Sequence, residues 1–405
     1  EGTEASHGHH FTHPDPLRVA DFIERHASAL PTEGDAFILR GKLDNCRLRF
    51  ERDRVGTVVF LGGSITAGRG WRDQVCDDLR VRFPDTDFTF INAGIPSTGS
   101  ITGAMRFERD VLAYAPVDLL FEEAAVNDAG IGFTDLQQQR GMEGIVRRAL
   151  TANPLCDVVV MHFVDPGKIR DYTNAQVPQT IQNHEAVTEH YHLTTIHLAK
   201  EVTDRIAAGE FTWEDDFKNL HPSPFGHALY THTISTMFDL AWASDLPEDA
   251  APTDHALPDP LDPLAYFGAS ILPPDSATDL AGFAVDESWR PTDNTRTRPG
   301  FVNVPMLVAE NPGDCFTLDF TGTAVGLWVA AGPDAGIVES RVDGGEWQAT
   351  NQFARHSTHL HLPRIYLLAQ DLAPGDHTLE LRITPGTDAR SNGTACRIVG
   401  FVVNE

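Results

Sequence analysis

Short apolar runs alternate with stretches of helical periodicity between residues 55 and 240. The run 57–61 ends in two glycines and is typical of a buried parallel strand. The predicted strands are 57–61, 88–91, 118–121 and 157–163, and the predicted helices are 71–83, 102–114, 137–150, 184–191, 196–207 and 223–240. Strands that alternate with helices predict a parallel sheet covered by helices on both faces.

The pattern changes beyond residue 246. Residues 247–264 are rich in Pro and Asp, which excludes a helix or a central strand and predicts a linker. Short β-prone runs follow, separated by Gly, Pro and Asp turns, at 315–320, 324–330, 336–342, 359–367, 377–383 and 396–403. This spacing predicts an all-β sandwich or jelly roll. The predicted parts are an N-terminal arm and lead-in (1–49), an α/β domain (50–246), the linker (247–264) and the sandwich (265–405).

Charge narrows the range of partners. The chain has 58 acidic and 31 basic residues among its 405, a net charge of −27. This disfavours a protein that binds the phosphate backbone of a nucleic acid, and it disfavours attraction to anionic membranes. No apolar run approaches about 18 residues, so we expect no transmembrane helix.

Cysteines and N-terminal histidines offer little chemistry. The five cysteines form no C-x-x-C motif, which disfavours a zinc or redox site. Cys315 and Cys396 would pair in an exported protein, and two buried free thiols are an equal alternative. The first 16 residues read as a polar arm. Metal binding is a minor alternative for its four histidines, His7, His9, His10 and His13.

Two other histidine groups are predicted to be surface features. His359 and His361 share one face of a predicted strand, but no nearby Cys or carboxylate completes a metal site, so we expect an exposed polar face. His184, His190 and His192 belong to a predicted helix and the turn after it, and we expect them at the surface as well.

The strongest chemical signal is Gly62-Gly63-Ser64, directly after the first strand. In an open α/β sheet, ligands bind beyond the carboxyl ends of the strands, so Ser64 would project into the crevice there. The glycines permit a tight turn, and the start of the next helix favours developing negative charge. Taken alone, the motif is equally consistent with a purely structural turn.

Later loops supply matching groups. Residues 92–100 follow the second strand, and Asn127 follows the third, where Glu123 would brace its loop. The N–H of Ser64, an N–H of the 92–100 loop and the Asn127 amide would form a three-donor oxyanion hole. His221, just before the last helix, would take the proton from Ser64.

These four blocks together resemble the SGNH (GDSL-type) hydrolase superfamily, over about residues 50–245. The resemblance implies a flavodoxin-like three-layer α/β/α fold and an esterase or acyl hydrolase. It assigns the nucleophile to Ser64, an oxyanion donor to Asn127 and the base to His221. Block III departs from the family pattern because Ala125 replaces a glycine, but Ala is small enough for the loop to survive.

The second block leaves its oxyanion donor open. Gly94, Ser97 and Gly99 each offer a backbone N–H. We favour Gly99 because it immediately precedes the next helix, whereas a strict count from Asn92 favours Ser97.

The fifth block departs most from the family. An aspartate normally stands three residues before the histidine, and here that position is Lys218. Asp216 is the predicted substitute that orients the imidazole. The alternatives are Asp215, a Ser-His dyad oriented by a backbone carbonyl, and a decayed site.

The predicted function is a serine esterase that hydrolyses O-acyl, chiefly O-acetyl, esters on a carbohydrate or polysaccharide through an acyl-enzyme. It rests on a resemblance to carbohydrate-esterase branches and on the appended sandwich. No metal or organic cofactor is needed. The alternatives are a lipase or arylesterase of the same superfamily, an acyltransferase, and a silent carbohydrate-binding protein. Secretion or a periplasmic location suits such a substrate, and the sequence leaves the compartment open.

The tryptophans of the sandwich do not decide between these functions. A sugar platform and a place in the core are both open for Trp289, Trp328 and Trp347.

Overall fold

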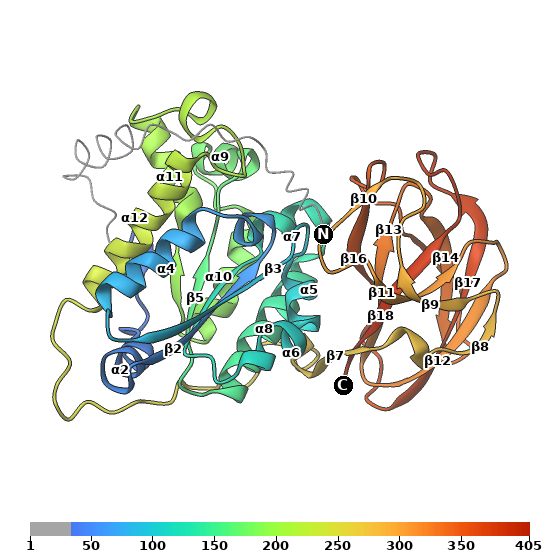
Figure 1. Ribbon diagram of the computed structural model, residues 1–405, viewed down its shortest axis with the longest axis horizontal. Helices are drawn as coiled ribbons and strands as arrows, with labels where there is room; N and C mark the ends of the chain where they lie inside the picture. The colour runs from blue at the N-terminus through green and yellow to red at the C-terminus, as the bar shows by residue number, and fades with distance from the viewer. Residues whose placement is uncertain (1–33) are drawn as a thin grey trace, which may run out of the picture. The chain divides into compact units, whose positions relative to one another are not determined.

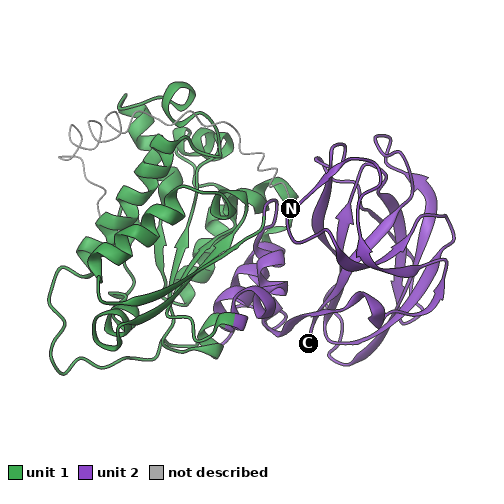
Figure 2. Cartoon of the chain, viewed as in Figure 1, with its two compact units in different colours: residues 1–95, 114–135, 149–258 green, residues 96–113, 136–148, 259–405 purple. Residues whose placement is uncertain are grey.

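The computed structural model describes residues 34–405, so the predicted histidine-rich arm lies outside the described residues. The chain forms two compact units (Figure 2). Unit 1 comprises the described residues up to 95 together with 114–135 and 149–258. Unit 2 comprises residues 96–113, 136–148 and 259–405. Residues predicted to lie in one α/β domain are therefore divided between the two units.

Unit 1 contains a six-stranded sheet in the order β1-β6-β5-β4-β2-β3 (Figure 1). All neighbours are parallel except β1 and β6. The strands are β1 (Phe37–Ile38), β2 (Val55–Gly62), β3 (Asp87–Gly94), β4 (Leu119–Glu123), β5 (Asp157–Met161) and β6 (Thr194–Ile196). This largely parallel sheet between helices confirms the fold class predicted from the sequence.

Helices cover both sides of this sheet. Helix α4 packs against α12, and α10 lies on the other side of the sheet (Figure 1). The helices assigned wholly to unit 1 are α2 (Asp44–Leu48), α3 (Ser64–Ala67), α4 (Trp71–Arg82), α7 (Ala125–Ile131), α9 (Pro166–Thr173), α10 (Gln179–His190), α11 (Leu198–Ala207) and α12 (Pro224–Ala241). Two π-helical turns, η2 (Arg49–Asp53) and η4 (Trp213–Phe217), complete the set.

The single helix predicted over residues 102–114 is wrong. The chain instead forms α5 (Ser100–Met105), α6 (Phe107–Asp110) and the 3₁₀ turn η3 (Leu112–Tyr114). The first break falls at Arg106, whose φ and ψ of −94° and 4° leave the helical region. Arg106 is buried and forms an ion pair with Asp110 at 2.8 Å. The spacing of apolar residues does not reveal such a break, because the buried side chain at the break is polar.

Aromatic side chains fill the core of unit 1 beside the turn that carries Ser64. Trp71 is fully buried at the start of α4 and makes edge contacts with Phe60, Phe121 and Phe163, at ring-centroid distances of 5.6, 6.2 and 5.4 Å. Phe60 and Phe121 lie on neighbouring strands and stack at 5.2 Å. Such contacts fix the position of α4 on the sheet.

Residues 247–264 form neither helix nor strand, and those up to residue 258 are tied to unit 1 by polar contacts. His255 Nε2 lies 2.9 Å from the buried Asp157 carboxylate, and Asn45 Nδ2 donates to the Thr253 carbonyl at 2.8 Å. Arg52 donates to the carbonyls of Pro247 and Ala250. Residues 247–258 therefore form an irregular segment that these hydrogen bonds attach to the rest of unit 1.

Unit 2 is built on two sheets of mainly antiparallel strands. One has the order β10-β16-β13-β18-β11-β9, with β7 also paired to β18, and the other is β15-β14-β17-β12-β8. The strands are β7 (Ala269–Leu272), β8 (Thr278–Ala281), β9 (Ala284–Trp289), β10 (Arg296–Thr297), β11 (Val304–Ala309), β12 (Cys315–Thr321), β13 (Ala324–Ala331), β14 (Gly336–Val342), β15 (Gln348–Asn351), β16 (Leu360–Ala369), β17 (Asp376–Thr387) and β18 (Cys396–Asn404). The predicted β-rich C-terminal domain is confirmed.

The core of unit 2 joins the two sheets. Leu327 and Phe401 of one sheet belong to the same buried cluster as Leu318 and Leu381 of the other. Every residue of β13 is buried, as expected for a strand at the centre of a sandwich.

The helical segments of unit 2 pack with its strands. Arg109 of α6 lies over the ring of Trp328, 4.6 Å from the centroid. Arg140 of α8 (Asp135–Ala152) forms ion pairs with Asp262 and Asp371, both at 2.7 Å. Two 3₁₀ turns, η5 (Tyr266–Gly268) and η6 (Pro274–Ser276), flank β7.

The three tryptophans of unit 2 differ in exposure. Trp289 and Trp328 are buried, so these two are core residues. Trp347 is half-buried, and the guanidinium groups of Arg341 and Arg382 lie over its ring at 4.6 and 4.1 Å from the centroid. A sugar-platform role therefore stays a prediction for Trp347 alone.

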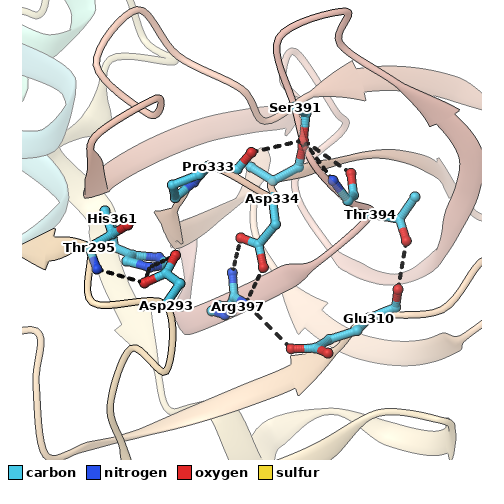
Figure 3. Close-up of polar contacts among 11 residues, drawn as sticks. Asp293, Thr295, Glu310, Pro333, Asp334, His361, Ser391, Thr394 and Arg397 are labelled. Atoms are coloured by element: carbon cyan, nitrogen blue, oxygen red, sulfur yellow. Dashed lines mark hydrogen bonds and ion pairs between the residues drawn. The ribbon is translucent and has the colours of Figure 1, made fainter.

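A polar network in unit 2 corrects the prediction for His361 (Figure 3). His361 is buried, not exposed, and its Nε2 lies 3.1 Å from the carboxylate of Asp293. A carboxylate does stand beside it, on a segment too far along the chain for spacing to reveal. Nearby, Asp334 pairs with Arg397 at 2.6 Å. His359 is exposed and precedes β16.

Cysteine state and membrane topology complete the description. Cys315 and Cys396 are free thiols, and Cys396 is buried. Within the described part of the chain, no helix combines the length and apolar character needed to span a bilayer.

The two faces of α4 provide a test of the packing. Leu79 is fully buried in the core of unit 1, whereas Val81 is 79% exposed on the same helix. We expect Leu79→Ala to lower the free energy of unfolding by about 2–5 kcal/mol, because it leaves a cavity. Val81→Ala should change it by less than about 0.5 kcal/mol. Urea unfolding of both variants measures the difference, and equal losses would contradict the assigned packing.

Candidate active site

Ser64 and His221 lie within hydrogen-bond distance of each other. The Oγ of Ser64 is 2.7 Å from the Nε2 of His221, although 157 positions separate them in the chain. Ser64 is the first residue of α3, directly beyond the carboxyl end of β2, and it is half-buried, while His221 is exposed. A hydroxyl and an imidazole in this geometry can form a nucleophile and its general base.

The turn that carries Ser64 leaves no room for side chains. A β-carbon on Gly62 would lie 2.9 Å from the carbonyl oxygen of Glu123 on the neighbouring strand. A β-carbon on Gly63 would lie 2.5 Å from Oδ1 of Asn127. Both glycines are therefore required by close approach, and the second contact places the Asn127 amide against the turn that carries Ser64.

The end of β3 also packs against this turn. A β-carbon on Gly94 would lie 2.4 Å from the backbone nitrogen of Ala67, so β3 and α3 are in backbone contact there. Asn92 strengthens the junction, because its Nδ2 donates to the Ala67 carbonyl at 3.0 Å and its Oδ1 accepts from the N–H of Gly94 at 3.0 Å. These contacts hold α3, and with it Ser64, against the sheet.

Buried charged groups hold the turn that carries Asn127. Glu123 Oε1 accepts from the N–H of Val126 at 3.0 Å, as the sequence predicted. Lys168 donates to the carbonyl of Ala125 at 3.2 Å and to the carboxylate of Asp165. Ala125 begins α7 with no positive φ, so the backbone there needs no glycine.

The next residue, Asp128, forms a fully buried pair with His184. Asp128 Oδ2 lies 2.9 Å from His184 Nε2, and both side chains are inaccessible to solvent. The prediction that His184 lies at the surface is therefore wrong. His190 is half-buried, and His192 is exposed as expected. Sequence reasoning missed Lys168, Asp128 and His184 as supports, and the one available signal was that Lys168 is one of only four lysines.

Burial shifts the ionisation of this support. Glu123 is 1% exposed, and burial raises its pKa to about 7, although Lys168 and the N–H of Val126 act in the opposite direction. The brace of the Asn127 turn is thus a carboxyl group that takes up a proton near neutral pH.

The segment before His221 is organised around Asp216. Thr212 caps η4, and its backbone N–H donates to Asp216 Oδ2 at 2.9 Å. Asp216 is buried, whereas Asp215 and Lys218 are exposed, and Lys218 adopts a left-handed φ of 78°. The N–H of His221 donates to Asn219 Oδ1 at 2.8 Å.

The three candidate donors of the 92–100 loop differ in setting. Gly94 ends β3, Ser97 adopts a left-handed φ of 71°, and Gly99 is the buried N-cap residue of α5. The Oγ of Ser97 accepts a long hydrogen bond, 3.4 Å, from Arg298 within unit 2. The choice of Gly99 stays a prediction.

Two solved structures share this fold over 92% of the chain, and a third is similar over less than half of it. A two-domain esterase active on acetylated mannans, co-crystallized with mannopentaose, is 23% identical, with a TM-score of 0.74 over 92% of this chain and 97% of that one. A second crystal structure of a two-domain esterase active on acetylated mannans is 24% identical, with the same TM-score over 92% and 98%. A variant of an acetyl xylan esterase from Geobacillus stearothermophilus is 18% identical, with a TM-score of 0.37 over 46% and 96%.

A likeness to a known family covers the part of the chain that contains Ser64, Asn127 and His221. No curated protein matches the chain. Residues 60–229 match the family model described as GDSL-like lipase/acylhydrolase. This segment of the chain is therefore similar to the GDSL-like lipase/acylhydrolase family.

Proposed function

We propose that the protein is a serine esterase that removes O-acyl groups, chiefly O-acetyl groups, from a carbohydrate or polysaccharide. The observation that carries this proposal is the 2.7 Å contact between Ser64 Oγ and His221 Nε2 beyond the carboxyl end of β2. The family match over residues 60–229 supports the reaction class.

The proposed reaction passes through an acyl-enzyme. His221 Nε2 takes the hydroxyl proton of Ser64 while Oγ attacks the ester carbonyl carbon. The carbon–oxygen bond to the sugar then breaks, and His221 returns the proton to the departing alkoxide. Water, deprotonated by His221, attacks the acyl-enzyme and releases the carboxylic acid and free Ser64. No step calls for a cofactor.

The proposed oxyanion hole contains the N–H of Ser64, the N–H of Gly99 and the amide of Asn127. Ser64 opens a helix, so its N–H has no partner within that helix. The amide of Asn127 packs on Gly63, directly before the nucleophile. Donors held in advance at the developing charge are worth roughly 10²–10³ in rate each.

An acetylated polysaccharide is the substrate class that the comparisons favour. The two-domain esterases that share the fold over 92% of this chain are described as active on acetylated mannans. The net charge of −27 favours a neutral polymer over one rich in uronate or sulfate, because like charges repel.

Acetate release tests the function and the nucleophile together. Wild-type protein should release acetate from acetylated glucomannan or acetylated xylan, and Ser64→Ala should lower the rate by at least about 10³-fold. Binding to deacetylated mannan should be unchanged in the variant, which distinguishes lost chemistry from lost structure.

Two outcomes would contradict the esterase proposal. Absence of turnover on every polymer and on 4-nitrophenyl acetate, with polymer binding retained, would indicate a silent binding protein. A preference for long-chain over acetyl 4-nitrophenyl esters would indicate a lipase instead.

Asp216 is the proposed residue that orients His221. Asp216→Asn keeps an oxygen that accepts from the N–H of Thr212, but it removes the negative charge. We therefore expect kcat to fall at least about 100-fold. The upper limit is the roughly 10⁴-fold fall in kcat that an Asp→Asn change causes in a Ser-His-Asp triad. The matched control, Asp215→Asn, alters an exposed neighbour and should leave kcat unchanged. Full activity in both variants, with intact circular dichroism, would favour a Ser-His dyad.

Glu123 predicts a pH-dependent stability. Its native pKa of about 7 exceeds the ordinary 4.5, so its proton stabilises the fold below about pH 4.5, and that stabilisation is lost as the pH rises through 7. Relative to Glu123→Gln, the wild type should lose up to about 3 kcal/mol of unfolding free energy over this range. Urea unfolding of both proteins between pH 5 and 8 measures the difference, and parallel curves would contradict the shift.

A further inference from the structure

A cluster of potential metal ligands lies in unit 1, apart from the Ser64–His221 pair. It consists of His162, Glu185 and His197, and the ligand atoms they offer all lie within 4.8 Å of one another. His162 directly follows β5, His197 directly follows β6, and Glu185 lies on α10. Three separate elements thus bring two imidazoles and one carboxylate together.

The geometry within the cluster is close. His162 Nε2 lies 2.8 Å from Glu185 Oε1, and the two imidazole rings have their centroids 5.7 Å apart. His162 is fully buried, and its Nδ1 has no hydrogen-bond partner among the described residues. His197 and Glu185 are only partly buried, so the cluster is reachable from solvent.

Burial disfavours the charged form of both imidazoles. Burial is the main cause that lowers the pKa of His162, and it lowers the pKa of His197 to about 4. A neutral imidazole keeps the nitrogen lone pair that a metal ion requires.

We propose that His162, Glu185 and His197 bind one divalent transition-metal ion, of which Zn²⁺ is the best match. Two imidazole nitrogens and one carboxylate oxygen suit Zn²⁺, whereas Mg²⁺ and Ca²⁺ prefer all-oxygen ligand sets. The hydrogen bond from His162 to Glu185 would be replaced by two metal–ligand bonds, and His197, which is partly exposed, would rotate to supply the third.

Arg40 supports the carboxylate from outside the cluster. Its Nη2 lies 3.2 Å from Glu185 Oε2, the oxygen that does not contact His162. Its Nη1 is anchored on the carbonyl of Leu193 at 2.9 Å and on Thr195 Oγ1 at 2.8 Å. Arg40 therefore orients Glu185 and leaves Oε1 for a metal, in the manner of an outer-shell partner.

The charge around the cluster limits the affinity. Besides Arg40, the cations that act on the two histidines are Lys168 and Lys200, and each is paired with a carboxylate, Asp165 and Asp204 respectively. The Glu185 carboxylate is balanced by Arg40. We therefore expect micromolar binding that rests on nitrogen coordination more than on net charge.

A metal at this position would act on stability. It would join α10 to the ends of β5 and β6, which are neighbouring strands of the sheet. His162 also lies beside His184, with ring centroids 6.0 Å apart, and His184 holds Asp128 next to Asn127. Binding should raise the melting temperature and leave the Ser64–His221 contact intact.

Zinc titration of the full-length chain tests the proposal. In the background protein for this experiment, His7, His9, His10 and His13 are replaced by alanine, so that these N-terminal histidines do not compete for zinc. We expect calorimetry with ZnCl₂ to give one Zn²⁺ per chain and the melting temperature to rise. His197→Ala and Glu185→Gln should each weaken binding at least 10-fold, while the exposed His192→Ala should bind as the background does.

Three results would overturn the assignment. The first is that the background protein binds no Zn²⁺ at 100 μM. The second is that His197→Ala binds Zn²⁺ with the same stoichiometry and affinity as the background protein. The third is that His221→Ala abolishes zinc binding, which would place the ion beside Ser64 instead. Co²⁺ absorption gives an independent readout, because the visible bands of a nitrogen-coordinated ion should disappear in His197→Ala.

Discussion

Close backbone approach at the end of β2 is the constraint on which the candidate site depends. Gly62 lies against the backbone of Glu123 on the neighbouring strand, and Gly63 lies against the side chain of Asn127. Any side chain at either position would push these groups apart. The proposed nucleophile and its proposed amide donor are therefore located by the same contact. The two strands keep this contact because they pair in parallel register up to this point.

Buried charge, rather than backbone geometry, completes the support. Glu123, Lys168 and the Asp128–His184 pair surround the turn that bears Asn127. Such groups are costly to bury, and they persist where each finds a partner. These paired groups lower the free energy of one arrangement of the turn relative to its alternatives. A fixed arrangement of donors is what electrostatic stabilisation of a transition state requires.

The sequence predicted the elements that show strong periodicity and missed those that depend on distant partners. The apolar run of β2 and the glycines after it led directly to Ser64, whereas β6 is only three residues long and carries too little pattern to identify. His184 and His361 were placed at the surface because their carboxylate partners lie 56 and 68 positions away. Local spacing finds loops that converge at one sheet edge, but it does not find pairs of side chains.

The proposed base and the proposed nucleophile are carried by parts of the fold that differ in burial. Ser64 follows β2, an inner strand of the sheet, and is half-buried, while His221 is exposed on the segment between η4 and α12, five residues beyond Asp216. Part of that segment belongs to the packing of unit 1, because Leu220 packs against the hydrophobic core and Ser223 is buried. Lys218 is exposed, at the position where the resemblance to the SGNH superfamily implies an acid. A substitution at this exposed position should cost little stability, whereas one at the buried Asp216 acts on the packing of the segment as well as on the proposed orientation of His221.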